Sequence, residues 1–239
     1  MPRVPLRRHD ISRLEAFSDA VFAFALTLLV VALEVPKSYD ELMKLMSGFP
    51  AFACCFAVLL AIWYEHNLFF RRYGLQDSYT VFLNGVLLFV VMFYVYPLKF
   101  MFDSGFAWIL PFASRSVTPM TLSQLSRASA IYGLGWVAVF VMFGLLYLHA
   151  YRQRHELGLS PLEVFKIKTF AGHHIVSAAI GVLVGLIAVA LPRRYSFMAP
   201  MAFIIMWPAH WLFGARSEKK RKAFEARMAA EPMPAPIEP

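Results

Sequence analysis

The chain has 239 residues, of which 59% are hydrophobic and 16% are charged, and its mean hydropathy is +0.58. Soluble domains are typically about 45–50% apolar and about 25% charged, so this composition excludes an ordinary soluble protein and indicates a membrane protein. In a membrane protein, a net charge of +8 is more informative about the orientation of the spans than about binding to nucleic acid.

Six segments are long and apolar enough to cross the hydrocarbon core, which takes about 20 residues of helix. The first apolar run is longer than the 7–15 residues or so of a cleavable signal peptide, so we expect it to remain in the mature protein. The expected fold class is all-α, a polytopic protein of six transmembrane helices. The predicted spans are Leu14–Val35, Phe49–Phe70, Thr80–Phe102, Ala130–Tyr151, Phe170–Leu191 and Ser196–Phe213.

The basic residues predict the orientation of these spans. Sixteen Lys and Arg fall in the N-terminus, the loops after the second and fourth spans and the C-terminus, and seven fall on the other side. Because cytoplasmic loops are enriched in Lys and Arg, both termini are predicted to be cytoplasmic, and the charge points to lipid contact and not to nucleic acid.

Two units are expected along the chain. Residues 1–215 form the transmembrane domain, and residues 216–239 form a basic cytoplasmic helix followed by a Pro-rich, disordered tail. The loop near 103–129 is predicted to be external and to form at most a short cap or a re-entrant segment.

Polar residues recur at one depth in the first three spans. Counting residues from the charged flanks at Arg13, Arg71 and Asp77 places Asp19, His66 and Asn84 about 8–11 Å inside the cytoplasmic boundary. Polar side chains are costly in hydrocarbon, so these are expected to face the bundle and pair with one another. Ser18, Glu65 and Asn67 are expected in the same layer, which either joins helices or serves ion access.

The first span has an apolar stripe on a different face from its acid. At 100° per residue, Asp19 lies about 140° from Phe24 around the helix. The stripe and the carboxylate are therefore expected to face different neighbours. The stripe near Phe24 consists of Phe17, Ala20, Phe24, Thr27, Leu28 and Val31.

The pattern R-x-x-x-F-S-D at the start of the first span, formed by Arg13, Phe17, Ser18 and Asp19, resembles the signature of the endosomal and lysosomal potassium channel family, transmembrane protein 175, in its prokaryotic single-repeat branch. The second and third spans are similar to that family as well. Their matching residues are Trp63 and His66 in the second span, and Asn84 and Pro97 in the third.

The resemblance implies a homotetramer whose pore is lined by the first helix and narrowed by bulky apolar residues. Carried onto this chain, the constriction is Phe24, with the hydroxyl of Thr27 in the ion path and Leu28 and Val31 as the next apolar layers. Phe24 stands where the family usually has Ile or Leu. Four phenylalanine rings could close the pore more fully or present their faces to a cation.

The same resemblance implies that potassium ions permeate the channel, and other monovalent cations could permeate it as well. It also implies a location in the lipid bilayer of the cell membrane. It implies no enzyme activity, cofactor or metal. We expect Asp19 and Ser18 to bond His66 and Asn84 on neighbouring helices and so to fix the rotation of the first helix.

Three alternatives stay open on the residues alone. Asp19, Glu65 and His66 could form the relay of a proton-coupled transporter. The four histidines at 149, 155, 173 and 174 could suggest a metalloenzyme, although no H-E-x-x-H spacing occurs. A scaffold would use the small-residue stripe of Ser177, Gly181 and Gly185, which is expected to be a packing face under every hypothesis.

Overall fold

The computed structural model describes residues 11–31, 35–109, 120–195 and 197–230. These residues form helices joined by short connections, with two 3-10 turns at Arg193–Tyr195 and Ala202–Ile205, so the predicted all-α class is confirmed. Six helical segments are long and apolar enough to cross a membrane, the last running from Met198 to Arg227. The α-helices are α1 (Arg13–Val31), α2 (Tyr39–Ser47), α3 (Phe49–Tyr73), α4 (Ser78–Ile109), α5 (Leu122–Arg152), α6 (Pro161–Ala190), α7 (Met198–Met201) and α8 (Met206–Ala230).

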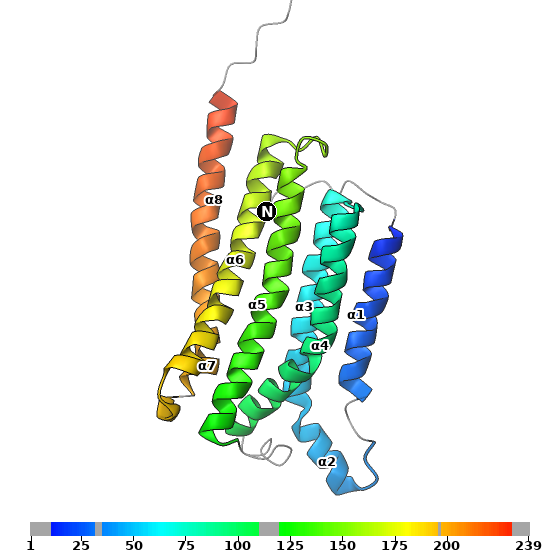
Figure 1. Cartoon of the computed structure of the whole chain (residues 1–239), viewed down its shortest axis with the longest axis vertical. Helices are drawn as coiled ribbons and strands as arrows, with labels where there is room; N and C mark the ends of the chain where they lie inside the picture. Colours follow the sequence, from blue (N-terminus) through cyan, green and yellow to red (C-terminus); the bar gives the residue numbers. More distant parts are fainter. Residues whose placement is uncertain (1–10, 32–34, 110–119, 196, 231–239) are drawn as a thin grey trace, which may run out of the picture.

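The long helices stand side by side with α1 at one edge of the bundle and α8 at the other (Figure 1). α1 packs on α3 and α4, α4 packs on α5, and α8 packs on α6. The start of α1, the α3–α4 and α5–α6 turns and the end of α8 lie at one end of the bundle, and α2 and the α6–α7 connection lie at the other (Figure 1). The segments that are rich in Lys and Arg, and that the sequence analysis assigned to one side of the membrane, thus share one end of the bundle.

Local sequence signals explain where the helices begin and end. At the start of α1, Ser12 Oγ accepts from Glu15 N (3.1 Å) and donates to Glu15 Oε1 (3.0 Å), which satisfies a free N–H of the first turn. Capping boxes begin α5 and α6. α3 ends at Gly74, whose φ of 60° is left-handed and suits glycine. Pro97 lies inside α4, which bends along its lower part (Figure 1), as expected where a proline removes a helix hydrogen bond.

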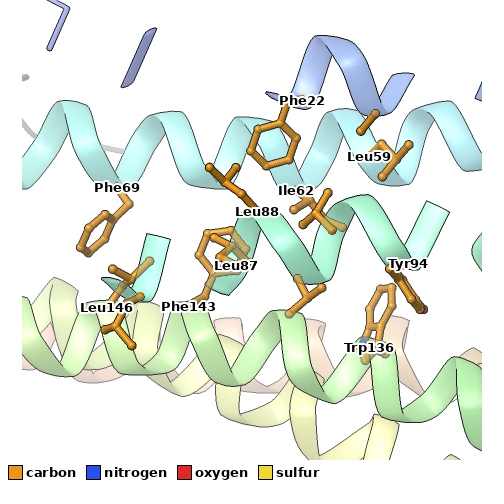
Figure 2. Close-up of a cluster of buried hydrophobic side chains, with 14 of the residues drawn as sticks. Phe22, Leu59, Ile62, Phe69, Leu87, Leu88, Tyr94, Trp136, Phe143 and Leu146 are labelled. Atoms are coloured by element: carbon orange, nitrogen blue, oxygen red, sulfur yellow. The ribbon is translucent and has the colours of Figure 1, made fainter. Parts of the chain in front are cut away.

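The main core lies between α1, α3, α4 and α5. Phe22 of α1 points towards Ile62 of α3 and Leu88 of α4, and Phe143 and Leu146 of α5 close the other side (Figure 2). Each of these side chains is at most 4% exposed. α1 therefore joins the bundle through one narrow face.

α5 and α6 approach each other closely through small residues. A Cβ added to Gly181 would lie 2.8 Å from Val137 Cγ2 and 3.1 Å from the carbonyl oxygen of Gly133. The indole of Trp136 donates to the carbonyl of Ser177 across the same interface (3.1 Å). The expectation that the stripe of Ser177, Gly181 and Gly185 is a packing face is confirmed at this contact.

Several boundaries differ from the sequence prediction. α4 continues to Ile109 and α5 begins at Leu122, so helix occupies much of the predicted 103–129 loop, and residues 110–119 lie outside the described residues. Residues 216–230 continue α8 without a break, because Arg221 pairs with Glu218 (2.5 Å) and Glu225 (2.6 Å) one turn away on either side. The predicted tail at 231–239 is also outside the described residues.

α2 is an element that the sequence analysis missed. Ser38 caps it by accepting a hydrogen bond from Glu41 N at 3.2 Å. The helix exposes Tyr39, Met43 and Met46. Its nine residues are too short to appear in a search for spans of about 20 residues.

Candidate functional site

A chain of three buried polar side chains joins α1, α4 and α3. Asn84 Nδ2 donates to Ser18 Oγ at 2.9 Å, and Asn84 Oδ1 accepts from His66 Nε2 at 2.7 Å. Ser18 Oγ in turn donates to the carbonyl of Leu14 at 2.8 Å. Each of the three side chains is at most 1% exposed. The expected bond between Ser18 and Asn84 is therefore present, whereas His66 bonds Asn84 and not Ser18.

Asp19 has a different partner from the one expected. Its Oδ1 accepts from the indole Nε1 of Trp63 on α3 at 2.7 Å, and no hydrogen bond joins it to His66 or Asn84 among the described residues. The prediction of those two partners for Asp19 is wrong. The reason is geometric, because one residue further along α1 is a rotation of about 100°, which turns Asp19 away from Asn84 and towards Trp63, one turn before His66 on α3.

The rings around His66 seal the network from one side. The His66 ring lies 5.4 Å from Phe22 and 4.6 Å from Phe70, centroid to centroid. Glu65 and Asn67 flank His66 on α3 and are half-buried. Neither of these two side chains hydrogen-bonds to the network within the part of the chain that the structure describes, so the polar layer is narrower than predicted.

Among the described residues, the opposite face of α1 is largely uncovered by its own chain. Phe17 is 60% exposed, Phe24 52% and Val31 70%. Ala20 and Thr27 are also exposed, and Leu28 is half-buried. These are the six residues of the predicted stripe.

Other polar residues of α1 lie at Thr27 and at the helix start. Thr27 Oγ1 donates to the carbonyl of Ala23 (2.9 Å), so its hydroxyl oxygen keeps its acceptor lone pairs on the exposed face. Arg13 is the first residue of α1 and is exposed, whereas Glu15 is only 7% exposed and is held by Ser12. Arg13 and Glu15 thus lie on different sides of the helix end.

A hydrogen bond that the sequence analysis missed ties the α3–α4 turn to α5. Asp77 Oδ2 lies 3.0 Å from His149 Nε2 and 2.6 Å from the hydroxyl of Thr80, which donates to it. Partial burial raises the pKa of Asp77, but the hydrogen bonds from Thr80 and His149 outweigh it and lower the pKa to about 2. Asp77 also caps α4, because the backbone N–H groups of Tyr79 and Thr80 donate to its Oδ1.

The four histidines considered as metal ligands lie in separate environments. His149 pairs with Asp77, His173 Nδ1 lies 3.0 Å from Nδ1 of His210 on α8, and His174 stacks on Phe143 with centroids 5.0 Å apart. His155 lies in the α5–α6 turn. Within the described ranges, no group of three or more His, Cys, Asp or Glu could hold a metal ion.

The sequence of this chain is similar to those of known potassium channels. Residues 13–94 match the family described as endosomal/lysosomal potassium channel TMEM175, a range that holds α1, α3 and the network. A potassium channel of Marivirga tractuosa is 33% identical over 230 residues, 92% of this chain and 93% of that protein. A potassium channel of Chamaesiphon minutus is 30% identical over 149 residues, 59% of this chain and 66% of that protein.

Two crystal structures share the fold. A variant of the potassium channel MtTMEM175, solved in complex with a nanobody fusion protein, has a TM-score of 0.80 at 32% identity, with 92% of this chain and 98% of that chain covered. A lysosomal potassium-selective channel homologue of the same family from Chamaesiphon minutus has a TM-score of 0.50 at 26% identity, with 86% and 96% covered.

Proposed function

Because this chain belongs to the endosomal/lysosomal potassium channel TMEM175 family, we propose that it is a potassium-permeable leak channel in which four copies surround a pore lined by α1. The relatives named above are potassium channels, and their family is not one of enzymes. The proposal includes the homotetramer, the pore wall formed by α1 and a location in the cell membrane.

The observation that carries the proposal is the division of α1 into two faces. Ser18 is fully buried against Asn84, whereas Phe24 and Val31 are more than half exposed. In a channel of four copies, a face left open by its own chain is available to the symmetry axis. The buried polar face then acts as a brace that sets the rotation of the pore wall.

The chemistry of the open face suits a hydrophobic gate. Phe24, Leu28 and Val31 would form successive apolar rings, which control conduction by dewetting. Thr27 would supply a ring of hydroxyl oxygens to a partly dehydrated ion. If the Phe24 rings present their faces to the axis, each attracts a cation by about 0.5–2 kcal/mol.

The arrangement of the basic segments supports a cytoplasmic location for both termini. The α3–α4 turn, the α5–α6 turn and the end of α8 share one end of the bundle (Figure 1), and the sequence concentrates Lys and Arg in these segments. The positive-inside rule then orients this end towards the cytoplasm. The Ser18–Asn84–His66 network would lie in the cytoplasmic half of the membrane.

The transporter alternative has less support from the described contacts. A proton relay through Asp19, Glu65 and His66 needs these side chains to be connected, but Asp19 bonds Trp63 and His66 bonds Asn84. An indole N–H donates without accepting, so Trp63 does not extend a relay. The family membership also favours a channel.

Recording from purified protein in planar bilayers tests the proposal. Under opposed potassium and sodium gradients, we expect a potassium-selective reversal potential for the wild type and a larger conductance with altered selectivity for Phe24→Ala. Trp211→Ala is the matched control, because Trp211 is an exposed aromatic residue (73%) on α8 at the far edge of the bundle. Equal currents from Phe24→Ala and wild type would remove Phe24 from the pore, and an absence of ion current in both would contradict the channel.

A further inference from the structure

We propose that each subunit binds one anionic phospholipid, with its headgroup in a basic pocket at the α5–α6 turn and an acyl chain in the apolar groove between α5 and α6. This inference does not depend on the proposed pore, because it concerns the side of the bundle away from α1. It rests on the charge of the pocket, the shape of the groove and the residues that the two share.

The headgroup pocket has a volume of about 310 Å³ and lies between the α5–α6 turn, the start of α6 and Phe224 of α8. Arg154, His155 and Lys168 line it, its other lining residues are apolar, and none is acidic. Phe165 stacks on Phe224 at 5.6 Å and closes the side towards α8. The permanently charged residues that line the pocket, Arg154 and Lys168, are therefore both cations.

The two permanent cations of the pocket are held close together without a counter-ion. The Arg154 guanidinium lies 4.6 Å from the centroid of the Tyr151 ring, and Lys168 Nζ lies 5.1 Å from the same centroid. The two charges are thus at most about 10 Å apart, held against one aromatic ring. Within the described residues neither forms an ion pair with a carboxylate, so a bound anion would relieve their mutual repulsion.

Two nearby acids are engaged elsewhere, and Glu156, in the α5–α6 turn, is exposed and does not line the pocket. Glu163 Oε2 accepts from the backbone N–H of Ser160 at 2.8 Å as part of the α6 cap. Glu225 Oε1 lies 2.6 Å from Arg221. Both carboxylates are committed to local structure, which leaves the pocket cations to an external anion.

An apolar groove of about 670 Å³ continues from this pocket along α5 and α6. Lys168 lines both cavities, and Tyr151, which carries the two cations, lines the groove. The groove extends along α6 from Lys168 to Val182, a rise of about 21 Å. That length passes the midplane of a hydrocarbon core about 30 Å thick, which suits an acyl chain entering from one rim.

Small residues create the hollow. A Cβ added to Gly144 would have no atom within 4 Å outside its own helix, so the missing side chain leaves open space. Alanines at 171, 178 and 179 line the opposite wall. Val141, Leu148, Ile175 and Val182 of the groove are exposed apolar residues, so in a membrane the groove is expected to face lipid.

Lipid titration of the purified full-length protein, followed by native mass spectrometry, tests this proposal. The probes are phosphatidylglycerol and phosphatidylcholine with identical acyl chains, and we expect one phosphatidylglycerol per subunit, bound more tightly than phosphatidylcholine. Arg154→Gln and Lys168→Gln should each weaken phosphatidylglycerol binding about fivefold, the effect of about one basic residue near a membrane surface. Arg71→Gln is the matched control, because Arg71 is an exposed basic residue at the same end of the bundle, outside the pocket.

Two further arms identify the occupant. Gly144→Leu should weaken binding of both lipids, because it fills the groove and leaves the pocket charges in place. Glycerol phosphate at the lipid's concentration should not displace phosphatidylglycerol. Equal binding of the two lipids, equal losses from Arg71→Gln and the pocket variants, displacement by glycerol phosphate, or dissociation of the oligomer by Gly144→Leu would each overturn the proposal.

Discussion

The side-chain amide of Asn84 on α4 donates to the hydroxyl of Ser18 on α1, at 2.9 Å and with both side chains fully buried. This bond crosses between two membrane helices, and Asn84 uses its other end to accept from His66 on α3. One amide therefore fixes the relative rotation of three helices, including the helix that we propose to line the pore.

Removal of this bond should lower the free energy of unfolding, and the effects of replacing Ser18 and Asn84 should not be additive. A double-mutant cycle of Ser18→Ala and Asn84→Ala, measured as unfolding free energy in detergent, should give a coupling between about 0.6 and 1.7 kcal/mol, which are the average and the maximum found for hydrogen bonds between membrane helices. Asn67→Ala is the control, since Asn67 lies outside the network. Additive effects of Ser18→Ala and Asn84→Ala would show that the bond does not orient α1.

The Asp19–Trp63 hydrogen bond should be needed for assembly and flux. Asp19→Ala and Trp63→Phe each remove one partner of the 2.7 Å bond. Both variants should therefore lower the oligomer fraction in size-exclusion chromatography and the potassium flux into liposomes. The double variant should have an oligomer fraction and a flux no lower than those of Asp19→Ala. Asp40→Ala, at an exposed acid on α2, should resemble wild type. Normal assembly and flux in Asp19→Ala would exclude a bracing role for this carboxylate.

The Thr27 hydroxyl should affect ion selectivity and leave stability unchanged. Thr27→Val keeps the shape but removes the oxygen, so the ratio of potassium to sodium permeability from reversal potentials should fall while the melting temperature stays within a few degrees. Thr169→Val is a matched control, because Thr169 Oγ1 likewise donates to the carbonyl one turn earlier, at 3.1 Å, on α6. An unchanged permeability ratio in Thr27→Val would place the hydroxyl outside the ion path.

The Asp77–His149 pair should make stability depend on pH in the acid range. The folded pKa of Asp77 is lowered to about 2 from an ordinary value of 3.8, so its stabilising contribution is complete above pH 4 and is lost as the pH falls towards 2. Asp77→Asn should therefore lower the melting temperature at pH 5 and differ less from wild type at pH 2. A gap between the two proteins that is constant from pH 5 to pH 2 would contradict this linkage.

The contact between Gly133 and Gly181 should tolerate no added carbon. A Cβ on Gly133 would lie 2.9 Å from the carbonyl oxygen of Gly181, so Gly133→Ala should lower the melting temperature. Gly144→Ala, on the same helix with open space around it, should be neutral or stabilising, because alanine favours helix by about 1 kcal/mol. Equal melting temperatures for the two variants would mean that α5 and α6 do not depend on this approach.

The sequence by itself determined the six spans and the two faces of α1. Hydropathy is a property of a local stretch of chain, and helical periodicity fixes the angle between residues such as Ser18 and Phe24 before any neighbour is known. The signature of Arg13, Phe17, Ser18 and Asp19 was also readable from the chain, and it led to the family that the comparisons confirm.

Only the tertiary structure decided which residues meet. Periodicity gives a direction around one helix, but the partner found in that direction depends on how the helices pack, so Asp19 meets Trp63 and not His66. The Asp77–His149 contact and the basic pocket beside Phe224 could not be predicted for the same reason, because each brings together residues that are distant in sequence. A nine-residue helix such as α2 is too short for a span search, although its cap from Ser38 to Glu41 is local to the sequence.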